Sequence, residues 1–205
     1  MQKNRILILF AHPLFEKSNA NKALVNHIPN SEHITFHDLY EEYPQFDIDI
    51  KREQELLAQH DIIIWHHPIY WYSCPPLLKQ WIDMVLEHSW AYGKKGNALK
   101  DKILFQVITT GGPRENYCRE GKDRFSIPEL LEPFNQTAQV CKMNYLPPFV
   151  VHGTHEMDDK GYKENGLLYQ QLLTFLIDTA PSTEIHDHYY LNDWFSTLKT
   201  DTNGQ

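Results

Sequence analysis

Short runs of branched and aromatic apolar residues alternate along the chain with longer segments whose apolar residues recur at helical spacing. An apolar run bounded by turn residues predicts a buried strand, and such runs cover residues 5–11, 33–39, 61–66, 102–109 and 149–152. The segments between and after them predict helices over residues 19–27, 51–59, 77–88, 127–143 and 167–179.

This alternation of strand and helix predicts a parallel sheet with helices on both faces, a three-layer α/β fold. Five strands favour the flavodoxin-like strand order 2-1-3-4-5 over a six-stranded dinucleotide-binding sheet. Residues 1–179 are expected to form this domain. Residues 180–205, which are polar with scattered aromatic residues, are expected to form a C-terminal tail or arm of the same domain. Ligands of such sheets bind beyond the carboxyl ends of the strands, so the loops after the first, third and fourth strands are the candidate site.

The composition is that of a globular chain with an acidic balance: 205 residues, 41% hydrophobic and 22% charged, with a formal net charge of −8. A nucleic-acid-binding surface is not expected, because phosphate backbones need a basic face. An anionic cofactor would have to be held by local N–H donors and helix dipoles. The three cysteines form no CxxC pair and no apolar run is long enough to span a bilayer, which favours a reduced, cytoplasmic setting.

The loop after the first predicted strand carries His12 and leads into a helix that Ser18 or Asn19 can cap. A helix N-terminus offers free N–H groups and the positive end of a dipole, which suit a phosphate. Ser18, Asn19 and Asn21 could add hydroxyl and amide donors, although ordinary capping with a structural His12 would give the same sequence. Neither GxGxxG nor GxxxxGK[ST] occurs, which argues against a Rossmann dinucleotide site or a P-loop.

The loops after the third and fourth predicted strands have features that suit a planar ring. Residues 69–72 place three consecutive aromatic side chains in a loop, where exposure is costly and an apolar wall against a ring is a use for them. A hydrophobic plug or a dimer contact is the alternative. Residues 109–112 end in two glycines, which let the backbone approach a ligand closely. A plain turn would have the same sequence, so the three loops are informative only together.

Three segments in this order and spacing, AHP…SNAN, HPIYWYSCPPLLKQWID and ITTGG, resemble the NAD(P)H:quinone oxidoreductase family of flavodoxin-like proteins. The segment HDLYEEYPQFDIDIKREQELLAQHDIIIWHHPIYWYS is closer still to the ancillary subunits of bacterial glutathione-gated potassium-efflux systems. The similarity runs from about Ile6 to about His152. It implies a cytoplasmic flavoprotein that passes hydride from NAD(P)H to quinones, with FMN rather than FAD as its cofactor. It also implies a homodimer, and a regulatory role at a potassium/proton antiporter of the inner membrane.

The same resemblance implies roles for particular residues. The flavin phosphate would be held by His12, Ser18, Asn19, Ala20 and Asn21. The flavin ring would be held by Ile69, Tyr70, Trp71, Tyr72, Thr109, Thr110, Gly111 and Gly112. Tyr117 falls where quinone reductases of the family carry a tyrosine that faces the substrate, so Tyr117 is the candidate catalytic residue.

Two positions depart from the family pattern. Pro113 follows the glycine pair, where a small residue is usual, and it removes one N–H donor. Asp123 stands six residues after Tyr117, where animal-type members carry a histidine that assists charge relay. A carboxylate cannot supply an imidazolium, so the rate or the range of acceptors is expected to differ.

Other functions stay open on the residues alone. The chain could be a regulatory subunit that docks on the antiporter with weak or no catalysis. Histidine pairs at residues 66–67, 152–155 and 186–188 raise a metal site, although solvated or capping histidines are commoner, and no metal ligand is assigned. A thiol mechanism through Cys74 or Cys118 is a further possibility. Cys74 lies beside a predicted helix N-terminus, which lowers a thiol pKa, and a buried small apolar residue is the alternative.

Overall fold

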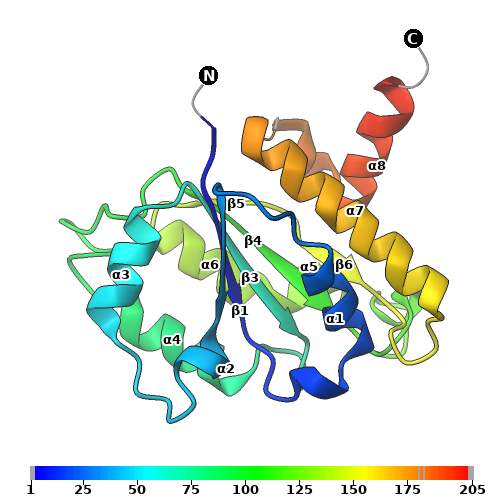
Figure 1. Cartoon of the computed structure of the whole chain (residues 1–205), viewed down its shortest axis with the longest axis horizontal. Helices are drawn as coiled ribbons and strands as arrows, with labels where there is room; N and C mark the ends of the chain where they lie inside the picture. The colour runs from blue at the N-terminus through cyan, green and yellow to red at the C-terminus, as the bar shows by residue number, and fades with distance from the viewer. Residues whose placement is uncertain (1–2, 180, 182, 203–205) are drawn as a thin grey trace.

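A computed structural model describes residues 3–179, 181 and 183–202 of the chain. Its sheet is parallel and has the order β2-β1-β3-β4-β5, with β6 also paired to β4 (Figure 1). The strands are β1 (Ile6–Phe10), β2 (Ile34–Asp38), β3 (Ile62–Pro68), β4 (Ile103–Thr109), β5 (Asn144–Tyr145) and β6 (Phe149–Val151). The predicted flavodoxin-like strand order is confirmed.

The fifth position of the sheet is divided between two short strands, and only the second of them was predicted. β5 pairs with the start of β4 and β6 with its end. Pro147 and Pro148 lie between β5 and β6. A proline cannot donate to a strand ladder, so the pair interrupts the edge strand there. Two residues are too few for an apolar pattern to show, which is why the sequence did not predict β5.

The helices form the two outer layers of the molecule (Figure 1). One face of the sheet packs against α1 (Asn19–Asn26), α7 (Asp159–Asp178) and α8 (Leu191–Thr202). The other face packs against α2 (Leu39–Glu42), α3 (Ile50–Ala58), α4 (Pro76–Val85), α5 (Ile127–Leu130) and α6 (Glu132–Val140). Short 3-10 turns occur at η1 (Phe15–Lys17), η2 (Arg114–Asn116) and η3 (Thr183–Asp187). The sheet is therefore covered on both faces, as the strand pattern predicted.

Two predicted helices have different bounds for identifiable reasons. The segment 127–143 is two helices, because Pro133 near the start of α6 cannot continue the hydrogen-bonding of α5. α7 begins at Asp159, eight residues before the predicted start, with Asp158 as its N-cap accepting from the Gly161 N–H. Its first two turns are polar, so they carry no apolar periodicity that could have marked them.

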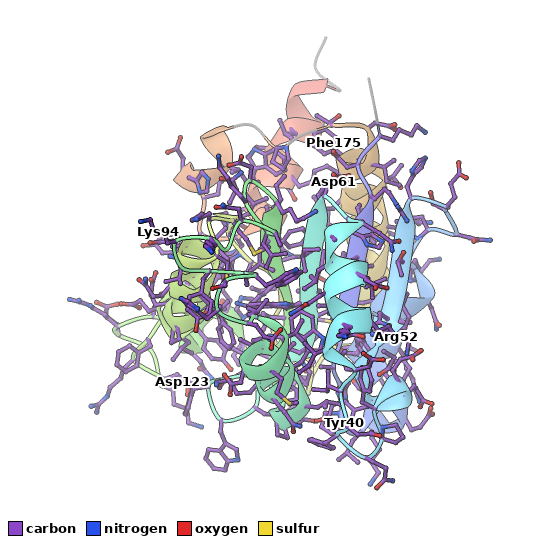
Figure 2. All side chains as sticks on the ribbon, turned by 90° about the vertical axis from the view of Figure 1, so that its left-hand side faces the viewer. Tyr40, Arg52, Asp61, Lys94, Asp123 and Phe175 are labelled. Carbon is purple, nitrogen blue, oxygen red and sulfur yellow. The ribbon has the colours of Figure 1, made fainter. Side chains whose placement is uncertain are left out.

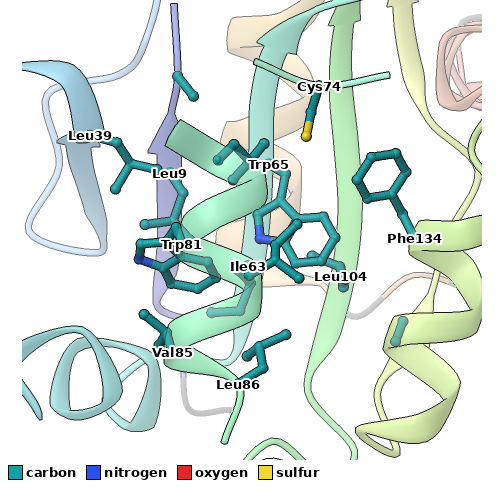
Figure 3. Packing of buried hydrophobic residues seen from close by; sticks show 14 of the residues in the cluster. Leu9, Leu39, Ile63, Trp65, Cys74, Trp81, Val85, Leu86, Leu104 and Phe134 are labelled. Carbon is teal, nitrogen blue, oxygen red and sulfur yellow. The ribbon is translucent and has the colours of Figure 1, made fainter. Parts of the chain in front are cut away.

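Buried apolar side chains on the α4 face pack against the centre of the sheet. Trp65 of β3 faces Phe134 of α6 with 5.9 Å between ring centroids, and Trp81 of α4 is fully buried beside them (Figure 3). Trp81 also donates to the carboxylate of Glu53, a buried residue on the inner face of α3. His37 and Tyr43 contact the same carboxylate at 2.9 and 2.6 Å. Burial raises the pKa of Glu53, but these three contacts outweigh it and the net direction is downward.

Residues 183–202 of the stretch expected to form a tail or arm consist of η3, a short connection and α8. Residues 180, 182 and 203–205 of that stretch lie outside the described residues. Leu191, Trp194 and Phe195 are buried and pack with β6 and α7 on the core. Because polar residues separate these three, the sequence pattern did not predict an apolar helix face here.

Candidate functional site

The three loops singled out in the sequence meet at the carboxyl ends of β1, β3 and β4. In Figure 2, Tyr40 and Asp123 lie at this end of the sheet, and Asp61 and Phe175 lie at the opposite end. Asn21 of α1 joins the loops: its side-chain N–H groups donate to Thr109 Oγ1 at 3.0 Å and to Ser18 Oγ at 2.9 Å. Its amide oxygen lies 3.1 Å from His66 Nε2 at the end of β3. Only 1% of Asn21 is exposed, so this amide is a buried connection between three strand ends.

The contact to Asn21 defines the protonation of His66. Since the Asn21 oxygen accepts, His66 Nε2 carries the proton and Nδ1 has a bare lone pair, for which the described residues provide no partner. Burial lowers the pKa of His66 to about 3. His66 is therefore a neutral donor at physiological pH, and its contact to Asn21 does not depend on charge.

The start of α1 has the N–H donors that binding of an anion would need. Ser18 caps the helix by accepting from the Asn21 N–H at 3.2 Å. Within the described part of the chain, the backbone N–H groups of Asn19 and Ala20 have no acceptor. They add to the positive end of the helix dipole. This donor set fits a phosphate, and it offsets locally the repulsion expected from a net charge of −8.

His12 lies at the end of β1 beside this helix start. Its Nδ1 accepts from the Leu14 N–H at 3.1 Å, so a neutral ring carries its proton on Nε2. Burial lowers the pKa of His12. The residue can therefore contribute one N–H to an anion without needing a charge.

The aromatic loop after β3 is a tight turn at residues 70–73. The Tyr70 and Ser73 backbones exchange two hydrogen bonds at 3.0 and 3.1 Å. Between them Trp71 and Tyr72 have φ angles of 49° and 62°, in the left-handed region that costs a bulky residue energy. The Trp71 side chain is 94% exposed, whereas Tyr70 is partly buried and its ring lies edge-on to that of His12. The strained turn therefore places the Trp71 side chain in solvent, with little contact to the other described residues.

The loop after β4 has buried side chains and an accessible backbone. Thr109 and Thr110 are buried, and the Thr110 hydroxyl donates to the Gly112 carbonyl at 2.9 Å. A Cβ on Gly111 would lie 2.4 Å from the ring of His155, and one on Gly112 would lie 3.0 Å from the side-chain amide of Asn116. Residues 109 and 110 thus hold the loop in place, and glycine is needed at 111 and 112 because His155 and Asn116 fill the space that a side chain would take. The N–H groups of both glycines have no acceptor among the described residues.

Tyr117 follows directly on η2 and turns back over this backbone. Its hydroxyl lies 3.5 Å from where a Gly112 Cβ would be, and its backbone N–H donates to the Arg114 carbonyl at 3.1 Å. Burial raises the pKa of Tyr117, so the phenol stays protonated and can donate. Asp123, the residue that departs from the family pattern, accepts from the Tyr72 hydroxyl at 3.1 Å. Asp123 therefore links the second and third loops.

The structure adds a residue that the sequence did not single out for this site. His152 directly follows β6, and its ring lies 5.7 Å from the Tyr117 ring centroid. Its Nδ1 is 3.4 Å from the Thr110 hydroxyl, and its buried Nε2 has no partner among the described residues. Burial, followed by the charge of Arg114, lowers the pKa of His152 to about 4. Its place at the carboxyl end of a predicted strand was the available signal.

The structure does not favour the thiol and metal alternatives raised from the sequence. Burial raises the pKa of the Cys74 thiol to about 11, which disfavours a nucleophilic thiolate. The Cys118 thiol donates to the Glu115 carbonyl. Over the described part of the chain, no three His, Cys, Asp or Glu side chains converge as a metal site would require. A groove of about 790 Å³ lies away from the strand ends, between α6, β5 and residues 186–189.

Stability should fall as the pH falls from 6.5 towards 4.5, because five histidines have folded-state pKa values that burial lowers below the ordinary 6.5: His12, His60, His66, His67 and His152. In this window the unfolded chain binds more protons than the folded chain, so their contribution is complete above 6.5 and is lost on acidification. Urea unfolding from pH 7.5 to pH 4.5 measures the slope. Replacing His66 and His152 by glutamine should make it shallower, and an unchanged slope would contradict this assignment.

Comparisons with known proteins agree with the fold. The family described as "Flavodoxin-like fold" matches residues 4–173. The "Glutathione-regulated potassium-efflux system ancillary protein KefG" of Erwinia tasmaniensis is 40% identical over 168 residues, which is 82% of this chain and 91% of that protein. A crystal structure of general stress protein 14 from Treponema denticola in complex with FMN has a TM-score of 0.80 and 39% identity, covering 84% of this chain and 99% of that chain. An NADPH-quinone reductase from P. pentosaceus has a TM-score of 0.75 and 36% identity, covering 82% and 97%.

Proposed function

Because the chain belongs to the flavodoxin-like-fold family, we propose that it binds FMN across the three loops and uses it to reduce quinones with NAD(P)H. The observation that carries the proposal is that the backbone N–H groups of Asn19 and Ala20 at the start of α1, and those of Gly111 and Gly112 after β4, have no acceptor among the described residues. Asn21 connects these two features directly through Thr109. A phosphate at one end and a flat ring at the other match this arrangement.

On this proposal, different residues bind the phosphate and the ring of FMN. The phosphate would be held by the N–H groups of Asn19 and Ala20, with Ser18 and His12 beside them. The ring would lie against the turn at residues 69–72 and the backbone of residues 109–112, while Asn21 acts through the buried network. The relative solved in complex with FMN supports FMN over FAD. When bound, the flavin supplies the hydride acceptor and donor chemistry, which belongs to the cofactor.

The chain's own residues orient the substrate and hold a proton. Tyr117 keeps its phenol proton and lies over the Gly112 backbone, so it can donate to a carbonyl oxygen of a quinone. Asp123 fixes Tyr72 on the other side of the opening. Neutral His152, packed against Tyr117, limits access of water to the phenol from the β6 side.

Tyr117→Phe should lower kcat/KM for a simple benzoquinone by about tenfold, the effect of losing one hydrogen bond of about 1.4 kcal/mol in the transition state. FMN affinity should stay within about twofold, because the phenol hydroxyl holds no part of the phosphate site. The measurement is steady-state oxidation of NADH and NADPH by FMN-loaded protein, with quinone varied. Absence of quinone-dependent turnover in the FMN-loaded wild type would contradict the proposed reaction. An unchanged kcat/KM in the variant would contradict only the role of Tyr117.

The similarity to KefG favours a second role for the same protein, as an ancillary subunit of a glutathione-regulated potassium-efflux system. On this proposal the chain works in the cytoplasm and reaches the inner membrane through its antiporter partner. Among the described residues, no helix is long and apolar enough to cross a membrane. Cosedimentation with vesicles that contain a glutathione-gated potassium/proton antiporter tests the role. If vesicles without the antiporter sedimented the same amount of the protein, the proposed ancillary role would be contradicted.

A homodimer belongs to the same proposal. Trp71 is held in solvent by a strained turn, which is the arrangement expected where a second copy covers the side chain. Sedimentation equilibrium of wild type and Trp71→Ala measures the association directly. A wild type that stays monomeric at high micromolar concentration would contradict the dimer.

A further inference from the structure

The C-terminal helix α8 lies outside the residues 4–173 that the family match covers, yet it is fastened to the site. At its start the Leu191 N–H donates to the Pro148 carbonyl at 2.9 Å. The Asn192 side chain accepts from the Val150 N–H at 2.8 Å and donates to the Val150 carbonyl at 3.2 Å. Asn192 therefore pairs with the edge of β6 as a neighbouring strand would, and it sets the position of the helix against the sheet.

From this position α8 reaches Arg114, the residue that starts η2 after the glycine pair. Asp193 holds the guanidinium with two hydrogen bonds, of 3.0 and 2.6 Å. Tyr190 lies under the same group, with 4.6 Å between the guanidinium carbon and the ring centroid. A planar guanidinium held on one edge and on one face has little freedom left. Arg114 is thus positioned by Asp193 of α8 and by Tyr190.

A second line of contacts runs from Tyr190, the residue directly before α8, to the backbone of residues 110–112. The Tyr190 ring packs edge-on against His152 at 5.3 Å between centroids. His152 in turn lies 3.4 Å from the Thr110 hydroxyl, which donates to the Gly112 carbonyl. Tyr190 therefore contacts Arg114, which lies within residues 110–117, and His152, which packs against that segment at Tyr117.

We propose that Tyr190 and Asp193 are positioning residues, through which the C-terminal helix holds the 110–117 segment in the shape that receives the flavin ring and places Tyr117. The proposal rests on the proposed function for its ligand and on contacts within this chain for its mechanism. Because Tyr117 donates its backbone N–H to the Arg114 carbonyl, a displacement of Arg114 would carry Tyr117 with it. A mobile segment must be ordered when the ligand binds, which weakens binding and misplaces the phenol.

The test compares Asp193→Ala with Asp83→Ala, which removes the carboxylate of another surface ion pair, between Lys79 and Asp83 on α4. Asp193→Ala should raise the Kd for FMN about three- to tenfold and the KM for quinone by a similar factor, since loss of preorganisation acts on binding. Asp83→Ala should leave both unchanged. Asp193→Glu, which restores the carboxylate, should recover at least half of the loss. If Asp193 only stabilised the fold, Asp193→Ala would lower the melting temperature and leave the Kd for FMN and the KM for quinone unchanged, which would contradict the proposal.

Limited trypsin digestion gives a readout that needs neither flavin nor activity. Initial cleavage after Arg119, Lys122 and Arg124 should be about three- to tenfold faster in flavin-free Asp193→Ala than in wild type. Cleavage after Lys94 and Lys95, in the α4–β4 connection, should not change. Unchanged cleavage together with unchanged FMN affinity would overturn the proposal while leaving the flavin site standing. Faster cleavage in a chain that binds no FMN would retain the contact between α8 and the segment, and would overturn its proposed role for the flavin.

Discussion

Replacing Asn19 by proline should weaken FMN binding about ten- to a hundredfold without unfolding the chain. Proline lacks the N–H at this position, and a hydrogen bond to a charged group is worth about 1.5–3 kcal/mol. The fold should tolerate the change, because Asn19 is the first residue of α1 and Ser18 before it is extended, with φ −100° and ψ 102°. Proline favours that helical position and requires an extended residue before it.

Asn19→Ala is the matched control for this variant, since it removes the exposed side chain and keeps the N–H. It should bind FMN within about threefold of wild type. Riboflavin, which lacks the phosphate, should bind wild type and Asn19→Pro equally. Titration of flavin fluorescence measures all five combinations, FMN with the three proteins and riboflavin with wild type and Asn19→Pro. Equal FMN affinity for proline and alanine variants would place the phosphate elsewhere.

Replacing Asn21 by leucine should lower the free energy of unfolding of the flavin-free chain by about 2–4 kcal/mol, because it leaves a buried donor on His66 and a buried acceptor on Thr109 without partners. For a chain of this size the melting temperature should fall by about 5–15 °C. Asn21→Leu is also expected to weaken FMN binding, because the loops after β1 and β4 lose their direct connection.

Asn135→Leu in α6 makes the same chemical change at a partly exposed position, where the amide contacts only Glu132 and Gln139. It should change the free energy of unfolding by less than about 1 kcal/mol. Urea denaturation of flavin-free protein compares the two variants without any contribution from bound ligand. Equal stability of both would show that the buried amide network does not hold the loops.

The strand order and the meeting of the three loops could be predicted from the sequence, because both follow from five apolar runs and the chirality of their connections. Asn21 and Thr109 were placed in one site on that basis and do lie within 3.0 Å of each other. The structure adds that the Asn21 amide has internal partners in Thr109, Ser18 and His66, and a direct contact of Asn21 or Thr109 with a cofactor stays a prediction. Residue types alone do not tell which side-chain hydrogen-bond donors have partners within the protein and which are left for a ligand.

The contribution of the C-terminal stretch could not be predicted, for a reason that lies in its pattern. Leu191, Trp194 and Phe195 form a narrow apolar face within a polar segment, so the segment resembles a solvated tail. The contact between Arg114 and Asp193 joins residues 79 positions apart and leaves no local signal. Trp71 could be assigned to the candidate site from its place in the loop after β3. Its outward direction could not be predicted, because it follows from left-handed φ angles at Trp71 and Tyr72, which non-glycine residues rarely adopt.

Titration of the flavin-free chain with FMN, followed by quenching of flavin fluorescence, tests the central claim most directly. The account predicts saturation at about one FMN per chain with a Kd on the order of micromolar or tighter, and weaker binding of riboflavin. A folded chain that shows no quenching up to about millimolar FMN would contradict the three-loop site, since such affinity is below what the helix N-terminus and a ring contact should provide together.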